Sequence, residues 1–156
     1  MVAAGHPYTG LCQVVDMTPS STACSNLPSY PTSIALSAGG IVNGSPLICG
    51  GLLPTGNTPR EVDTCYRFEK TTNEWKLHAN LKFKRSHHSS AVANGALFVA
   101  GGIGPGVGDI DSTEFIYPDG TVESGPDLPE KKHAHCMVTL QNGKVMILGG
   151  TGSSRR

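Results

Sequence analysis

Charge is scarce in this sequence and balanced in sign. Charged residues make up 15% of the 156 residues, and 12 lysines and arginines offset 12 aspartates and glutamates. The basic residues do not gather into one tract. Binding to nucleic acid or to an anionic membrane depends on concentrated positive charge, so neither is expected as the main partner.

Long apolar runs are missing as well. The longest weakly polar stretch, residues 95–108, is interrupted by glycines and a proline, and it is shorter than the ~18 apolar residues that a membrane helix needs. No membrane span is therefore predicted. The first residues also lack the basic start and apolar stretch of a secretory signal, which indicates either a cytosolic protein or a missing true beginning.

Closely spaced cysteine pairs are absent too. The chain has five cysteines, and none of them belongs to a CxxC motif, so the usual zinc-binding spacing is missing. Metal binding by these thiols is not expected. Their odd number leaves at least one cysteine without a partner in this chain.

Turn-forming residues, in contrast, are abundant. The chain has 20 glycines and 11 prolines, a composition that favours many short segments joined by turns over a helical bundle or a coiled coil. The hydrophobic fraction of 38% is enough for the core of one ordinary domain.

A glycine doublet recurs at a nearly constant interval. The three doublets are Gly50-Gly51, Gly101-Gly102 and Gly149-Gly150. Each one ends an apolar, strand-like run, and the doublets lie 51 and 48 residues apart. Asn-Gly pairs at 43–44, 94–95 and 142–143 precede these runs, and this dipeptide favours tight β-hairpins because both positions tolerate positive φ. We therefore predict a hairpin-containing unit that repeats about every 50 residues.

Leucines and histidines follow the same repeat. Leu81 and Leu128 close short segments at matching places, as Leu27 does in the first unit, and His88 and His135 stand seven residues after their leucines. This recurrence favours a repeated packing or hydrogen-bonding role for the histidines.

Two further positions carry aromatic residues in the middle unit. Phe68 is followed seven residues later by Trp75, and Tyr117 and Val122 take the corresponding places in the next unit. We predict that Trp75 is an anchor between neighbouring sheets and that Trp75→Ala is among the most destabilising single changes.

These features together resemble the kelch repeat. A period near 50 with four short strands and a diglycine is typical of kelch propellers, and residues 62–75 have the kelch order of an aromatic, a turn and a tryptophan seven residues on. The pattern departs at Val122, where the family usually has Trp, and in residues 12–27, which carry neither aromatic anchor. The resemblance is to the kelch and galactose oxidase superfamily, and especially to cysteine-bearing secreted invertebrate kelch proteins.

The resemblance implies an all-β fold, namely a partial kelch-type β-propeller with about three blades of four-stranded antiparallel sheet and an incomplete ring. Residues 1–28 would end one blade, 29–80 and 81–128 would form full blades, and 129–156 would start another. Because propellers close with about 4 to 8 blades, the chain is interpreted as a fragment. Missing blades of the same chain, or assembly with other chains, would complete the ring. The structural motif residues are the six doublet glycines, Phe68, Tyr117, Trp75, Leu81 and Leu128.

Two cysteine pairs are candidate disulfides. Cys49 precedes a diglycine and Cys65 lies on the next strand, so the two can face each other across an antiparallel pair. Cys12 and Cys24 occupy the analogous hairpin of the first unit. Such pairing would indicate an oxidising compartment and a secreted protein, whereas four buried free thiols would suit a cytoplasmic one. Cys136 would await a partner outside this segment.

Residues with recognisable chemistry are few. No nucleophile stands beside a base, and we assign no catalytic, metal-binding or cofactor-binding residue and no cofactor. The pairs His87/His88 and His133/His135 allow a metal site, but the repeat favours packing. Basic residues after the two leucines can line a rim that binds an acidic peptide, or can form a solvated loop. These residues are Lys82, Lys84, Arg85, Lys131 and Lys132.

The expected function is protein interaction without catalysis. Loops between blades, 79–86 and 128–133, and within blades, 52–61 and 103–112, would present a recognition face to a protein or glycan ligand. Two alternatives stay open. One is a galactose oxidase-like enzyme whose active site lies outside this segment, and the other is an intracellular adaptor resembling ubiquitin-ligase kelch proteins.

Overall fold

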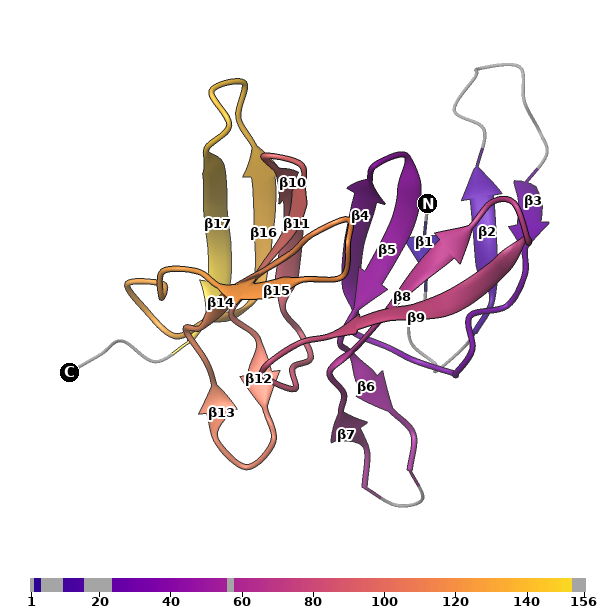
Figure 1. Cartoon of the computed structure of the whole chain (residues 1–156). Coiled ribbons are helices and arrows are strands. Elements are labelled where there is room, and N and C mark those ends of the chain that lie inside the picture. The colour runs from indigo at the N-terminus through magenta and orange to yellow at the C-terminus, as the bar shows by residue number, and fades with distance from the viewer. Residues whose placement is uncertain (1, 4–9, 16–23, 56–57, 153–156) are drawn as a thin grey trace.

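The computed structural model describes residues 2–3, 10–15, 24–55 and 58–152, and every regular element among them is a β-strand (Figure 1). The all-β prediction is confirmed. None of these residues belongs to a helix long and apolar enough to cross a membrane. The strands are β1 (Val2–Ala3), β2 (Cys12–Val15), β3 (Cys24–Leu27), β4 (Ala38–Val42), β5 (Ser45–Cys49), β6 (Leu52–Leu53), β7 (Arg60–Glu61), β8 (Thr64–Glu69), β9 (Glu74–Asn80), β10 (Ser89–Ala93), β11 (Ala96–Ala100), β12 (Ile103–Gly104), β13 (Gly108–Asp109), β14 (Thr113–Ile116), β15 (Val122–Ser124), β16 (His133–Thr139) and β17 (Val145–Thr151).

Four antiparallel sheets follow one another along the chain. Sheet I contains β1, β2 and β3, sheet II has the order β4-β5-β8-β9, sheet III has the order β10-β11-β14-β15, and sheet IV pairs β16 with β17 among the described residues. A two-stranded hairpin leaves sheet II between its second and third strands, and another leaves sheet III at the same point. These hairpins are β6–β7 and β12–β13. Sheets II and III therefore share one topology.

Sheets II, III and IV lie side by side with their first strands together (Figure 1). β4 contacts β10, and β10 contacts β16. Backbone hydrogen bonds join the starts of these inner strands, because His87 N–H donates to Leu36 O at 3.1 Å and Ala134 N–H donates to His87 O at 2.9 Å. All three residues have positive φ. The arrangement is open, with the sheets following one another around the line of inner strands.

Two of the predicted Asn-Gly corners are tight hairpin turns. Asn43 and Gly44 both have positive φ, as do Asn94 and Gly95, which is the conformation of a two-residue type I′ turn. At the third corner Gly143 has positive φ but its asparagine does not, as in a longer loop that ends in a left-handed glycine. The prediction of three identical turns is therefore wrong for the last hairpin.

Pairing register aligns sheets II and III residue by residue. Phe68 lies opposite Trp75, and Ile116 lies opposite Val122. Ile116, which is fully buried, therefore takes the place of Phe68. The expectation that Tyr117 is the aromatic anchor is wrong, because a shift of one residue along a strand moves a side chain to the other face.

The first unit is also offset from its sequence alignment. Leu81 and Leu128 are buried, and their N–H groups donate to Asp63 O and Asp111 O, which lie just before the third strand of the preceding sheet. In the first unit the equivalent bond comes from Tyr30, whose N–H donates to Gly10 O at 2.7 Å. Tyr30 is also buried, so Tyr30 and not Leu27 is the structural counterpart of the two leucines.

Hydrophobic clusters fill the three junctions between sheets. Junction I/II holds an aromatic cluster around Trp75. Junction II/III is aliphatic, with Leu47 of sheet II and Leu97 of sheet III in one cluster. Junction III/IV places Phe98 against Ile147. The core is thus divided into layers, one for each pair of neighbouring sheets.

Sheet IV has one uncovered face. Three large apolar residues stay exposed on its strands, namely Val138, Met146 and Leu148, and Leu140 is exposed directly after β16. By register, Met146 corresponds to Leu47, which is 1% exposed because sheet III covers it. Sheet IV therefore repeats a packing face that no described element covers.

Candidate interaction face

Loops from sheets II and III gather at one end of the sheets. Hairpins β6–β7 and β12–β13 project from this end (Figure 1), and the connections 81–88 and 128–132 lie beside them. Ser86 N–H donates to Ile103 O at 3.0 Å, and Ile103 N–H donates to Ser86 O at 2.8 Å, so the second hairpin is tied to its connection. We call this region the loop end. It comprises residues 52–55, 58–61, 81–88, 103–112 and 128–133.

Four of the five predicted rim residues lie on the loop end with solvent access. Lys82 and Lys84 are exposed, whereas Lys131 and Lys132 are half-buried. Lys132 Nζ lies 4.0 Å from Glu130 Oε2, a distance at which a solvated ion pair contributes little to stability. The loop end therefore offers accessible positive charge mainly at Lys84 and at Lys82, whose Nζ donates to Ser124 Oγ at 3.0 Å.

Arg85 is not a rim residue. Its side chain is fully buried, and its Nη2 lies 2.7 Å from Glu114 Oε1. Its Nη1 donates to Gly101 O and to Ser112 O, both at 2.8 Å. The rim prediction is therefore wrong for this arginine, because its charge is neutralised inside the protein at the base of the loop end.

Glu114 is the functional neighbour that sequence reasoning missed. Its Oε2 accepts from Lys82 N–H at 2.6 Å and its Oε1 accepts from Phe83 N–H at 3.3 Å, so one carboxylate ties the connection 81–88 to β14. Burial lowers the pKa of Arg85, and Glu114 opposes that shift. The one available signal in the sequence was a carboxylate inside an apolar strand.

Two large apolar side chains are exposed on the loop end. Phe83 is 52% exposed and Val107 is 67% exposed. Phe83 stands between Lys82 and Lys84, and Val107 lies at the tip of hairpin β12–β13. Aromatic anchors surrounded by polar groups are characteristic of protein-binding surfaces.

Two histidines lie near carboxylates on the loop end. His133 Nδ1 lies 2.7 Å from Asp109 Oδ1, and its Nε2 lies 3.3 Å from Thr151 Oγ1. Glu61 occupies the place in β6–β7 that Asp109 has in β12–β13. Burial lowers the pKa of His87, His133 lowers it further, and Glu61 opposes both effects. Each hairpin thus places a carboxylate near a histidine at the start of the next sheet.

The two histidine pairs of the sequence lie at different depths. His87 and His133 are partly exposed with ring centroids 5.9 Å apart, whereas His88 and His135 are buried. In the part of the chain that the structure describes, no group of three or more His, Cys, Asp or Glu side chains has a geometry that could hold a metal ion.

Comparison with known proteins identifies the repeat. No family model matches the chain. The chain is 28% identical to human Kelch repeat and BTB domain-containing protein 12, over 77% of this chain and 22% of that protein. It is 24% identical to an F-box/kelch-repeat protein of Arabidopsis thaliana, over 69% of this chain and 26% of that protein. The solved structure of YjhT matches with a TM-score of 0.70 at 10% identity, over 86% of this chain and 55% of that one.

The chain is built of kelch repeats. It spans about a quarter of the length of the curated relatives that it matches, and its fold is that of part of a kelch-type propeller. Sheets II and III are its two four-stranded kelch sheets, and the loop end is formed by the loops of these blades.

One predicted disulfide is present in the first of these blades. Cys49 on β5 lies directly opposite Cys65 on β8, with the two Cα atoms 4.0 Å apart and the sulfurs bonded. The prediction is confirmed. In the second blade Ala100 and Thr113 hold the same two positions, so the bond belongs to one kelch blade and not to the repeat.

The second predicted disulfide does not form. Cys12 is a buried free thiol whose cross-strand partner is Leu27, whereas Cys24 lies opposite Val15 at the other end of the β2–β3 pair. The pairing is therefore wrong, because the register places the two cysteines at opposite ends of the ladder. Cys136 is an exposed free thiol on sheet IV.

Trp75 lies between blades and away from the loop end's surface. Its indole Nε1 donates to Pro28 O at 3.0 Å, and its ring centroid lies 5.2 Å from that of Tyr30 and 5.4 Å from that of Phe68. The side chain reaches from the outer strand of one kelch blade to the preceding unit, so its contacts are those of packing.

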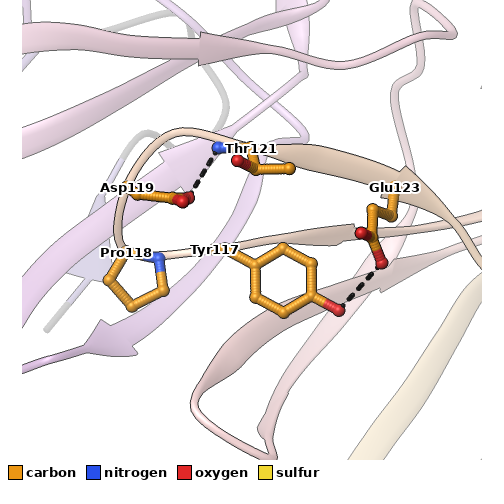
Figure 2. A pocket seen from close by; sticks show the side chains of 5 residues that line it. All are labelled: Tyr117, Pro118, Asp119, Thr121 and Glu123. Atoms are coloured by element: carbon orange, nitrogen blue, oxygen red, sulfur yellow. Dashed lines mark hydrogen bonds between the residues drawn. The ribbon is translucent and has the colours of Figure 1, made fainter.

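A shallow, open depression of about 530 Å³ lies at the β14–β15 turn, at the opposite end of the blade (Figure 2). It is lined by Tyr117, Pro118, Asp119, Thr121 and Glu123. Tyr117 Oη donates to Glu123 Oε2 at 3.1 Å, and Thr121 N–H donates to Asp119 Oδ1 at 2.9 Å. These polar groups bind one another within the turn.

Proposed function

We propose that this kelch chain is a protein-binding module and that the loop end is its recognition surface. The observation that carries the proposal is the exposed apolar and basic group on the loop end, made of Phe83, Val107, Lys82 and Lys84. Rigid sheets hold these side chains while the loops vary, which is the usual division of labour in such folds.

The composition of this group favours one kind of partner. Phe83 is an apolar anchor between two lysines, so a complementary surface has an apolar pocket bordered by carboxylates. The lysines would steer the encounter and make it sensitive to salt, whereas Phe83 and Val107 would supply most of the affinity by being removed from water.

The test uses the full chain as bait in a cross-linking pull-down, followed by affinity measurement on each captured protein. The triple variant Phe83→Ala, Lys84→Ala, Val107→Ala is expected to weaken binding by about 30-fold, the effect of losing a 2 kcal/mol hot spot. The matched control is Ile41→Ala with Leu77→Ala, two residues that are as exposed as Phe83 but lie away from the loop end. Equal losses in both variants, or unchanged binding in the triple variant, would contradict the proposal.

A second candidate concerns the cellular role. The names of the two curated relatives combine kelch repeats with a BTB domain or an F-box, which supports an adaptor role, whereas the Cys49–Cys65 disulfide is consistent with an oxidising compartment. Counting free thiols in protein from its native source, denatured without reductant, separates the two. Three free thiols out of five cysteines support the secreted form, and five support the adaptor.

A further inference from the structure

A buried histidine stands at each of two blade junctions. His88 is 7% exposed at junction II/III, and His135 is 6% exposed at junction III/IV. Each follows directly after a residue with positive φ at the start of an inner strand, as Ser37 follows Leu36 before β4. Sheets II, III and IV therefore carry Ser, His and His at one equivalent position.

The diglycines create the space that His88 occupies. A Cβ atom on Gly50 would lie 2.7 Å from His88 Cε1, and a Cβ on Gly102 would lie 2.9 Å from His88 Cβ. Contacts this short do not occur between real side chains, so the ring fits against the preceding blade only because position 50 is glycine. This interlock explains why the histidine and the doublets recur together.

His135 repeats the interlock one junction further on. A Cβ atom on Gly101 would lie 3.0 Å from His135 Cε1, and a Cβ on Gly150 would lie 2.8 Å from His135 Cβ. In both interlocks, neither ring nitrogen has a protein hydrogen-bond partner among the described residues. A protonated ring would therefore place an unpaired charge in a tightly packed junction.

The charges around His88 oppose its protonation. Burial lowers the pKa of His88 to about 3, and Arg85, His135 and His87 lower it as well, while the backbone of Cys49 has the opposite effect. These titratable groups come from the connection before β10 and from β16, and Arg85 is itself paired with Glu114 of β14.

His135 is in a comparable environment. Burial lowers its pKa, and Lys132 and His133 lower it further. An unfolded histidine has a pKa near 6.5, so the folded state favours the neutral ring. The stability that this preference provides is complete at neutral pH and is lost as the pH falls from about 6.5 toward the lower folded-state value.

We propose that His88 and His135 form an acid-sensitive latch: their protonation opens junctions II/III and III/IV, while junction I/II, which carries Ser37 at this position, stays closed. The loop end includes loops from both sides of junction II/III, so acid would also separate hairpin β6–β7 from hairpin β12–β13. Partner binding and blade packing would then share one pH dependence.

The first test follows each junction separately during acidification of the full chain. Trp75 is the single tryptophan and lies in junction I/II, so its fluorescence reports that junction. Hydrogen exchange by mass spectrometry, corrected for the intrinsic pH dependence, reports β10–β11 and β16–β17. We expect exchange protection of these strands to be lost about one pH unit above the change in Trp75 fluorescence. Simultaneous loss at all junctions would overturn the proposal.

The second test replaces each histidine by serine, the residue that sheet II has at this position (Ser37). His88→Ser and His135→Ser are each expected to lower the acid midpoint of their own junction by about half a pH unit. Lys76→Ser is the control, because Lys76 is exposed on outer strand β9, away from both histidines, and its replacement is expected to leave both midpoints unchanged. The proposal would be overturned if the acid midpoints were unchanged in both serine variants, or if the control variant shifted them by the same amount. If one variant fails to fold, the other variant and the exchange profile of the unaltered chain still decide.

Discussion

Junctions I/II and II/III use the same positions with opposite chemistry. Ile34 lies just before Ala35, which pairs with Leu52 of hairpin β6–β7. In the same way, Arg85 lies just before Ser86, which pairs with Ile103 of hairpin β12–β13. By strand register, Tyr66 of sheet II corresponds to Glu114 of sheet III. The two positions belong to an apolar cluster in junction I/II and form an ion pair in junction II/III. The repeated backbone determines where side chains meet, and different pairs of side chains satisfy the same place.

The apolar cluster and the buried ion pair respond differently to mutation. Removing part of an apolar cluster leaves a cavity whose cost depends on how far the neighbours relax. Removing one member of a buried ion pair leaves an unpaired charge in the interior, which costs more than the pair itself contributes. Mutations at equivalent positions should therefore have unequal effects, and the following predictions are ordered by size.

The largest effect is expected from breaking the ion pair. Glu114→Ala leaves Arg85 charged and buried, and should lower the free energy of unfolding by about 3 to 5 kcal/mol in urea titrations followed by circular dichroism. The double variant Arg85→Ile, Glu114→Tyr installs the residues of junction I/II and should lose much less. A double variant as unstable as Glu114→Ala would show that the two junctions are not interchangeable.

The next effect is expected at Trp75. Trp75→Ala removes the centre of the junction I/II cluster and should cost about 3 to 4 kcal/mol. Val122→Ala, at the equivalent place in sheet III, should cost about 1 kcal/mol because Val122 is smaller and partly exposed. The same urea titration measures both. Similar costs would mean that Trp75 is not the anchor of its junction.

The disulfide is expected to come third. Cys49→Ala with Cys65→Thr gives sheet II the residues that sheet III has at these positions. Closing a loop of this sequence separation, 16 residues, contributes about 3 kcal/mol in the chain-entropy model. Adding reductant to the unaltered chain should produce a loss of the same size. A loss of stability when reductant is added to the double variant would show that a different disulfide contributes to stability.

The smallest effect is expected at Tyr117. Ile116→Ala should cost about 2 to 4 kcal/mol because Ile116 is fully buried, whereas Tyr117→Ala should leave the thermal midpoint unchanged within error. The reverse order would restore Tyr117 as the aromatic anchor and would contradict the register of β14 with β15.

Several features could be predicted from the sequence because they depend on local chemistry. The glycine doublets and two of the Asn-Gly corners require positive φ, which few residues adopt easily, so they mark the ends of strands directly. The Cys49–Cys65 bond could be predicted because both cysteines lie at known distances from a doublet.

Other features depend on contacts that spacing does not reveal. The repeat spacing favours the aromatic Tyr117 as a motif residue, yet a single residue of register makes Ile116 the side chain that faces the core. The sequence groups Arg85 with the neighbouring lysines, whereas its burial depends on Glu114, a carboxylate on a strand 29 residues away. The loop end's hairpins could be predicted as loops, but not the exposure of Phe83.

The central claim is that successive kelch sheets pack face to face in chain order around the inner strands. A nuclear Overhauser spectrum of the methyl-labelled chain tests it most directly. We predict contacts between Val42 and Leu97, across junction II/III, and between Ile147 and the ring of Phe98, across junction III/IV. Contacts between the core of sheet II and the core of sheet IV, or the absence of both predicted sets, would contradict this account.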